Sequence, residues 1–195
     1  MPDTATREKV PPAAADLAVV RVRPARRGRE LWYALAAIAA VTALYAVASW
    51  EQASLPRASS LIGHGIGVAG FALMLLAAVL YPLRKARADA RWGSAAIWLR
   101  AHMVMGLVGP AMVFLHTGLK FSGLAGVAMV LTVVVAASGV VGRYLYTRSP
   151  RDGAAGGGRK ALATWHLIHL PLTWALFAAA FIHVVAALYY ATLQR

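Results

Sequence analysis

The chain has 195 residues, of which 60% are hydrophobic, and its mean hydropathy is +0.62. Both values lie far above those of an ordinary soluble protein, so the sequence indicates an integral membrane protein. The net charge of +13 does not indicate nucleic-acid binding, because the basic residues lie between long apolar runs. No cysteine is present, which excludes disulfides, iron–sulfur clusters, thiolate nucleophiles and covalently attached haem.

Residues 1–29 mix Ala, Pro and Arg without periodicity and are predicted to form a disordered basic cytoplasmic tail. Residues 30–195 contain five apolar runs long enough to cross a bilayer, which predicts one all-α domain, a bundle of five membrane-spanning helices. The first run is too long for the apolar part of a secretory signal, so it is interpreted as a retained span. The predicted spans are about 31–50, 61–83, 98–119, 121–146 and 162–190.

Lys and Arg alternate between the two sides of the predicted bundle. Of 20 such residues, 7 lie in the tail, 5 over residues 84–100 and 5 over residues 143–160, and the other 3 lie on the opposite side. The positive-inside rule therefore predicts a cytoplasmic amino terminus and a periplasmic carboxyl terminus. The third and fifth spans then run parallel, and the Gly-rich connection over residues 143–160 is predicted to be a flexible loop.

Four histidines form two equally spaced pairs in these parallel spans. His102 and His116 lie in the third span and His169 and His183 in the fifth, each 14 residues apart. Fourteen helical residues return to within about 40° of the same face after a rise of about 21 Å. His102 and His169, the inner pair, are thus predicted near the cytoplasmic boundary, and His116 and His183, the outer pair, near the periplasmic one. Two stacked pairs of imidazoles suit two haems with histidine on both faces.

A packing role is the alternative for these histidines. A lone membrane histidine is more often bonded to a backbone carbonyl or a hydroxyl than to a metal, but packing alone does not explain two matched pairs. Gly106 and Gly109 either leave space for a macrocycle or let helices pack closely, and both interpretations stay open. Pro110 and Pro171 are expected to kink or open their helices, which would aim a ligand.

Short motifs surround the four histidines: W-L-R-A-H at 98–102, F-L-H at 114–116, W-H-L-I-H-L-P-L at 165–172 and F-I-H at 181–183. Over about residues 98–190, this pattern resembles the ferric reductase-like transmembrane domains, and respiratory cytochrome b has a similar four-histidine bundle. The resemblance implies that His102, His116, His169 and His183 are axial haem ligands. No flavin or nicotinamide domain follows the last span, so the electron donor is expected to be another subunit, a soluble protein or the quinone pool.

Other polar residues are candidates for supporting roles. His166 lies about 100° off the face that His183 shares with His169, so it is interpreted as a propionate partner or a support for the ligand. His64 is expected near the outer boundary, where it either binds a quinone head group, contacts a haem propionate or caps a helix near water. Arg100, Arg143 and Lys160 at the inner boundary either pair with propionates or extend toward the membrane surface.

One motif is rejected. Gly65, Gly67 and Gly70 match the dinucleotide-binding pattern G-x-G-x-x-G, but they lie inside an apolar span with no preceding strand. Gly63 and Gly67 instead fit the spacing of small residues at which membrane helices pack.

The sequence therefore predicts a transmembrane electron-transfer subunit of a bacterial inner membrane with two non-covalent b-type haems, and a quinone as a further candidate cofactor. Its expected partners are the lipid bilayer and a periplasmic cytochrome or reductase, the quinone pool, or both, with no nucleic acid. It is expected to be the cytochrome b subunit of an oxidoreductase complex and not a complete enzyme. The alternatives are a transporter whose histidines bind a metal or relay protons, which the absence of Asp and Glu from the predicted spans disfavours, and a structural anchor.

Overall fold

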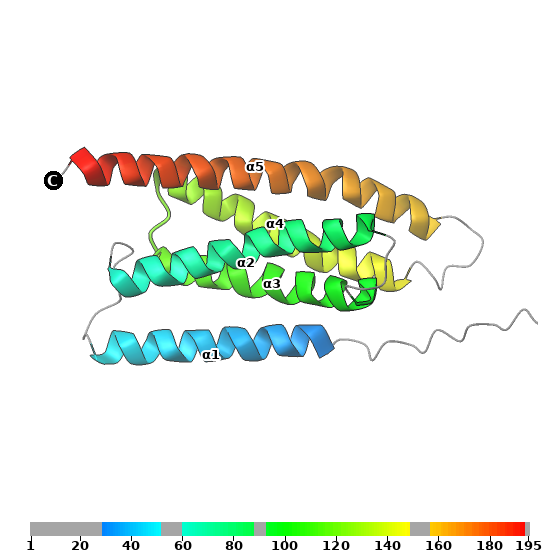
Figure 1. The fold of residues 1–195 in the computed structure, drawn as a ribbon, viewed down its shortest axis with the longest axis horizontal. Coiled ribbons are helices and arrows are strands. Elements are labelled where there is room, and N and C mark those ends of the chain that lie inside the picture. The colour runs from blue at the N-terminus through cyan, green and yellow to red at the C-terminus, as the bar shows by residue number, and fades with distance from the viewer. Residues whose placement is uncertain (1–28, 52–59, 88–92, 149–156, 194–195) are drawn as a thin grey trace, which may run out of the picture.

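In the part of the chain that the structure describes, five helices form a bundle, and each is long and apolar enough to cross a membrane, so the predicted five-span all-α architecture is confirmed. The computed structural model describes residues 29–51, 60–87, 93–148 and 157–193. Its helices are α1 (Arg29–Glu51), α2 (Leu61–Ala86), α3 (Ala95–His116), α4 (Gly123–Arg148) and α5 (Gly157–Leu193) (Figure 1). The predicted tail falls outside the described residues except for Arg29, which begins α1.

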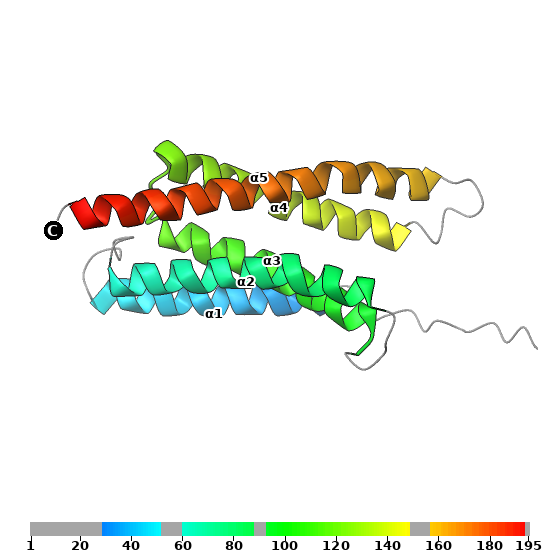
Figure 2. The same cartoon turned by 45° about the horizontal axis from the view of Figure 1, so that its top comes forward.

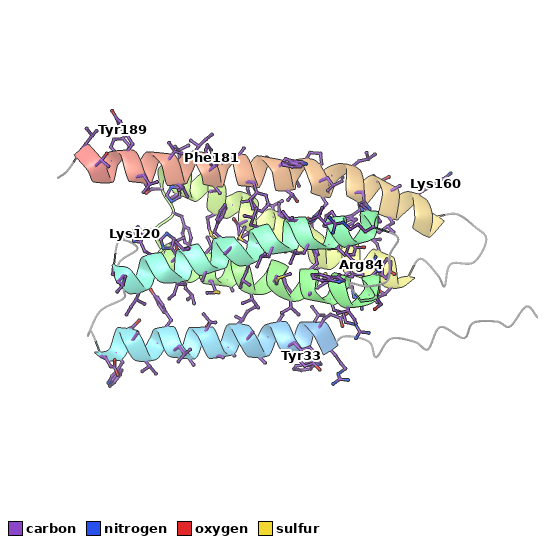
Figure 3. All side chains as sticks on the ribbon, viewed as in Figure 1. Tyr33, Arg84, Lys120, Lys160, Phe181 and Tyr189 are labelled. Atoms are coloured by element: carbon purple, nitrogen blue, oxygen red, sulfur yellow. The ribbon has the colours of Figure 1, made fainter. Side chains whose placement is uncertain are left out.

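Successive helices alternate in direction, so α1, α3 and α5 run one way and α2 and α4 run the other (Figure 1). The starts of α1, α3 and α5 therefore lie at the same end of the bundle as the carboxyl-terminal ends of α2 and α4. Figure 3 shows Arg84 and Lys160 at this end and Lys120 at the opposite end. We call the end that carries Arg84 and Lys160 the basic end. It is defined by Arg29, Arg84, Arg143 and Lys160.

The helices form two groups, with α4 and α5 on one side and α1, α2 and α3 on the other (Figure 2). Glycines allow the closest approach of α2 to α3, because an added Cβ at Gly70 would lie 2.8 Å from the Gly109 carbonyl oxygen. In the second group, a Cβ at Gly142 of α4 would overlap the indole of Trp165 on α5. Small residues thus set both helix contacts, as is usual where lipid removes the hydrophobic drive for association.

A buried ion pair joins α1, which packs on α3, to α4. Glu30, in the first turn of α1, is only 2% exposed, and its carboxylate accepts a hydrogen bond from the Arg143 guanidinium. The sequence prediction began the first span at residue 31 and therefore missed this acid. Its burial shows that the helix bundle extends past the uncharged segment that hydropathy detects.

The end of α3 differs from the sequence prediction. The helix ends at His116, three residues before the predicted end of the span at 119. Gly118 and Leu119 have φ of 54° and 63°, in the left-handed region, and the Thr117 hydroxyl donates to the Phe114 carbonyl oxygen. This turn ends the helix directly after His116. Hydropathy did not predict this end, because the residues that form the turn are not strongly polar.

The predicted flexible loop over residues 143–160 is wrong at both ends, because α4 continues to Arg148 and α5 begins at Gly157. Hydropathy locates the part of a helix that matches the bilayer, and backbone hydrogen bonding continues beyond it. At about 1.5 Å per residue, the 37 residues of α5 are longer than a bilayer requires. Helices α3 and α5 also continue through Pro110 and Pro171.

Candidate functional site

A cavity lies between the two helix groups and is lined by α2, α3, α4 and α5. The inner pair, His102 and His169, both line it, and the cavity volume is about 70 Å³. Apart from these two rings and two threonines, its walls are apolar or glycine: Met74, Ala77, Ala78, Met103, Gly106, Leu107, Pro110, Val135, Ala136, Gly139, Val140, Leu176 and Phe177. The structure therefore brings together two histidines from parallel helices in an apolar space.

His102 is held from the side of α2. Its Nδ1 lies 2.8 Å from the Ala77 carbonyl oxygen, and the Tyr81 ring packs beside it with centroids 5.5 Å apart. Because a carbonyl oxygen only accepts hydrogen bonds, Nδ1 of His102 carries the proton. The lone pair of Nε2 is then available to bind a metal.

His169 is held from the side of α4. Its Nδ1 lies 2.6 Å from the Ser138 hydroxyl, and its ring stacks on the Trp165 indole with centroids 4.7 Å apart. Ser138 donates its hydroxyl proton to the Val135 carbonyl oxygen at 2.8 Å. The hydroxyl therefore accepts from Nδ1 of His169, which leaves the Nε2 lone pair available, as in His102.

The remaining polar groups of the cavity wall are satisfied by the backbone. The Thr132 hydroxyl donates to the Ala128 carbonyl oxygen and the Thr173 hydroxyl to the His169 carbonyl oxygen. With these hydroxyl protons given to the main chain, the two imidazoles are the groups of the wall that are suited to metal binding.

The structure gives different roles to Gly106 and Gly109, which the sequence alone could not distinguish. An added Cβ at Gly106 meets nothing within 4 Å, and Gly106 lines the cavity. At Gly109 an added Cβ would lie 2.8 Å from Met74 Cγ and from the Gly70 carbonyl oxygen. Gly106 therefore leaves space in the cavity, whereas Gly109 serves helix packing. Gly139 of α4 adds a second open position, where the nearest heavy atom to an added Cβ is His169 Cε1 at 4.0 Å.

The outer pair lies at the other end of α3 and α5. His116 Nδ1 is 2.8 Å from the Gly63 carbonyl oxygen of α2, and its ring lies over Gly67, where an added Cβ would be 2.7 Å from Cγ. His183, the other member of the pair, is partly buried on α5. The residues around it on α5, Phe181, Ile182 and Val184, are exposed, so His183 lies on a less exposed face of the helix than they do.

His64 and His166 are placed differently from these four. The exposed His64 ring lies edge-on to His116, with centroids 6.1 Å apart. His166 is bonded within its own helix, since its Nδ1 lies 3.0 Å from the Leu162 carbonyl oxygen, and it does not line the cavity. His169 therefore reaches the cavity and His166 lies outside it.

The basic candidates lie at the basic end. Arg143 pairs with Glu30, while Arg100 and Lys160 are exposed. Ser138, Trp165 and Glu30 take part in these contacts but were not candidates from the sequence. Trp165 could have been identified from the sequence, because it adjoins a histidine. Ser138 could not, because it lies 31 residues from His169 and no sequence pattern links the two.

The three glycines of the rejected dinucleotide motif all lie within α2, where Gly67 and Gly70 pack against α3. Among the described residues, no group of three or more His, Cys, Asp or Glu side chains is placed to hold a metal ion together. No protein-family model matches the chain, and no curated protein or solved structure matches it.

Proposed function

We propose that this chain is a transmembrane electron-transfer subunit that binds two b-type haems, each between two histidines. Electrons pass between a quinol or cytoplasmic donor and a periplasmic partner across a bacterial inner membrane. The observation that carries the proposal is the apolar cavity lined by both His102 and His169, whose Nδ1 atoms are already bonded to α2 and α4. The resemblance of the histidine motifs to ferric reductase-like domains supports the same function.

The residues around this cavity fit a flat, apolar macrocycle with two axial imidazoles. Gly106 and Gly139 leave open positions on α3 and α4, and apart from the two histidines and two threonines the rest of the wall is apolar. Histidines that bind metals usually donate their second ring N–H to a carbonyl or another acceptor, as His102 and His169 do.

Each histidine has a defined task in this proposal. His102 and His169 ligate one haem through Nε2, and His116 and His183 ligate the other. The hydrogen bonds at Nδ1 fix the tautomer and orientation of His102, His169 and His116 and raise the basicity of their Nε2 atoms. Haem bound at these two depths supplies a one-electron couple at each.

The orientation follows from charge. The basic end carries Arg29, Arg84, Arg143 and Lys160, and the positive-inside rule places such an end in the cytoplasm. The inner pair then lies near the cytoplasmic side and the outer pair near the periplasmic side. His64, exposed beside His116, is our candidate for contact with a quinone or a haem propionate at that side.

Haem stoichiometry tests the proposal. We expect purified full-length protein to show a reduced b-type absorption spectrum and about two haems per chain by pyridine haemochromogen assay. His169→Leu should remove about half of the haem, because one of the two sites loses a ligand. His166→Leu is the matched control, since His166 is on the same helix and its Nδ1 is also hydrogen-bonded, to a backbone carbonyl, but it lies outside the cavity. It should keep the full haem content.

Two results would contradict the proposal. The first is protein that carries zinc or iron but no porphyrin, which would favour the transporter alternative. The second is an equal loss of haem in His166→Leu and His169→Leu, which would show that the cavity does not select the ligand.

A further inference from the structure

Ser138 and Trp165 surround the ring of His169 on two sides. The Trp165 indole stacks on the imidazole at an interplanar angle of 25°, and its Nε1 donates to the Ser138 carbonyl oxygen at 2.8 Å. The Ser138 hydroxyl in turn contacts Nδ1 of His169 at 2.6 Å. One serine of α4 is therefore bonded to two neighbouring rings of α5, through its backbone and its side chain.

The chain of hydrogen bonds has a single direction. The Ser138 hydroxyl has one proton, which goes to the Val135 carbonyl oxygen, so it accepts from Nδ1 of His169. A hydroxyl that donates to a carbonyl becomes a stronger acceptor, because hydrogen bonds in a chain polarise one another. The Nδ1–H bond of His169 is consequently strengthened, and electron density at Nε2 increases.

The position of Ser138 is itself fixed. Its backbone carbonyl is held by the Trp165 indole, and Trp165 can lie there only because Gly142, one turn further along α4, has no side chain. The arrangement of Ser138 around His169 therefore depends on residues of both α4 and α5.

We propose that Ser138 and Trp165 are positioning residues that set the tautomer, orientation and basicity of His169, and thereby lower the reduction potential of the inner haem. This inference rests on the proposed function. A more basic axial imidazole stabilises the ferric state over the ferrous state, so weakening the Nδ1–H bond should raise the potential.

Redox titration of the haem absorbance tests this inference in full-length Ser138→Ala protein. The inner haem is identified as the one that remains in His183→Leu. We expect Ser138→Ala to keep its haem and to shift the inner midpoint upward, with altered g-values in the ferric electron paramagnetic resonance spectrum. Ser138→Thr, which keeps the hydroxyl, should restore the wild-type midpoint. Trp165→Phe keeps a ring against His169 but lacks the indole donor, and should give a smaller upward shift.

Ser49→Ala is the matched control, because Ser49 makes a similar back-bond to the Tyr45 carbonyl oxygen on α1. It should leave both midpoints unchanged. Unchanged midpoints in Ser138→Ala would overturn the inference, as would equal shifts in Ser138→Ala and Ser138→Thr. If Ser138→Ala loses its inner haem and Ser138→Thr keeps it, the hydroxyl positions His169 more strongly than expected, which supports the inference; loss in both overturns it. Wild-type protein without haem would instead overturn the proposed function.

Discussion

The inner and outer histidine pairs share the same sequence spacing but are built differently. At the inner pair, His102 is held by a backbone carbonyl of α2 and His169 by a hydroxyl of α4, and a cavity lies between the helices. At the outer pair, His116 is held against α2 by the Gly63 carbonyl oxygen, while the His183 ring hydrogen-bonds to no residue that the structure describes.

This difference shows what helix spacing determines and what it leaves to the neighbours. A separation of 14 residues makes two side chains of one helix face the same way, whatever surrounds them. The anchors of His102, His169 and His116 come from α2 or α4, whose sequences carry no repeat that matches the histidines. The two sites should therefore depend on separate residues, and each can be disrupted without the other.

Gly67→Leu should have the largest effect on the difference between the inner and outer histidine pairs. A Cβ at position 67 would already lie 2.7 Å from His116 Cγ, so a leucine side chain displaces the ring that α2 holds. We expect the outer haem to be lost and the inner one kept, so that the haem content falls to about half by pyridine haemochromogen assay.

Gly65→Leu is the control for this substitution, because a Cβ at Gly65 meets nothing within 4 Å. It adds the same side chain to the same helix and should leave two haems. If both variants lose the same fraction of haem, the outer site does not depend on the contact between His116 and Gly67.

The ion pair at the basic end gives the next largest expected effect. Glu30→Gln leaves Arg143 largely buried and without its carboxylate, which should lower the free energy of unfolding by about 3 kcal/mol. Because Arg143 is one turn from Gly139 on α4, the inner site should lose its haem first on heating. Thermal unfolding followed by haem absorbance in detergent measures both effects.

The double variant Glu30→Gln, Arg143→Gln provides the control for this prediction. It removes both charges, so part of the lost stability should return. An unfolding free energy of Glu30→Gln equal to that of the wild type would show that the pair does not tie α1 to α4.

The number of helices was predictable from the sequence, because the length of an apolar run is a strong, local signal. Five spans were predicted, and the part of the chain that the structure describes contains five helices long enough to span. The helix ends were less accurate, since a turn at Gly118 and the helical continuation to Arg148 depend on backbone geometry that hydropathy does not measure.

The candidate site was predictable only in part. The four histidines stand out by spacing, but Ser138 could not be identified, because the face that α4 presents to α5 depends on helix packing and not on local sequence. Glu30 was missed because it lies one residue before the uncharged segment. The roles of Gly106 and Gly109 could likewise be assigned only once the helix positions were known, since the two glycines differ only in which neighbour they face.

Those two glycines provide a smaller test of the comparison. Gly109→Ala places a Cβ 2.8 Å from the Gly70 carbonyl oxygen and should reduce stability by about 2 kcal/mol through overpacking of α2 and α3. Gly106→Ala meets no neighbour and should gain up to about 1 kcal/mol from helix propensity. Unfolding of the two haem-free variants in denaturing detergent measures the difference, and equal stabilities would contradict the separate roles.

The smallest expected effect lies where the two helix groups meet. Phe71 of α2 and Phe177 of α5 form an edge-on pair with centroids 5.9 Å apart, and Phe177 also lines the inner cavity. A double-mutant cycle of Phe71→Leu and Phe177→Leu should give a coupling energy of about 1 kcal/mol, typical of aromatic pairs. Phe177→Leu should also broaden the spectrum of the inner haem, whereas Phe71→Leu, which does not line the cavity, should leave both spectra unchanged. A coupling energy of zero would mean that the two helix groups are joined by other contacts. A spectral change in the outer haem alone would show that Phe177 does not belong to the inner site.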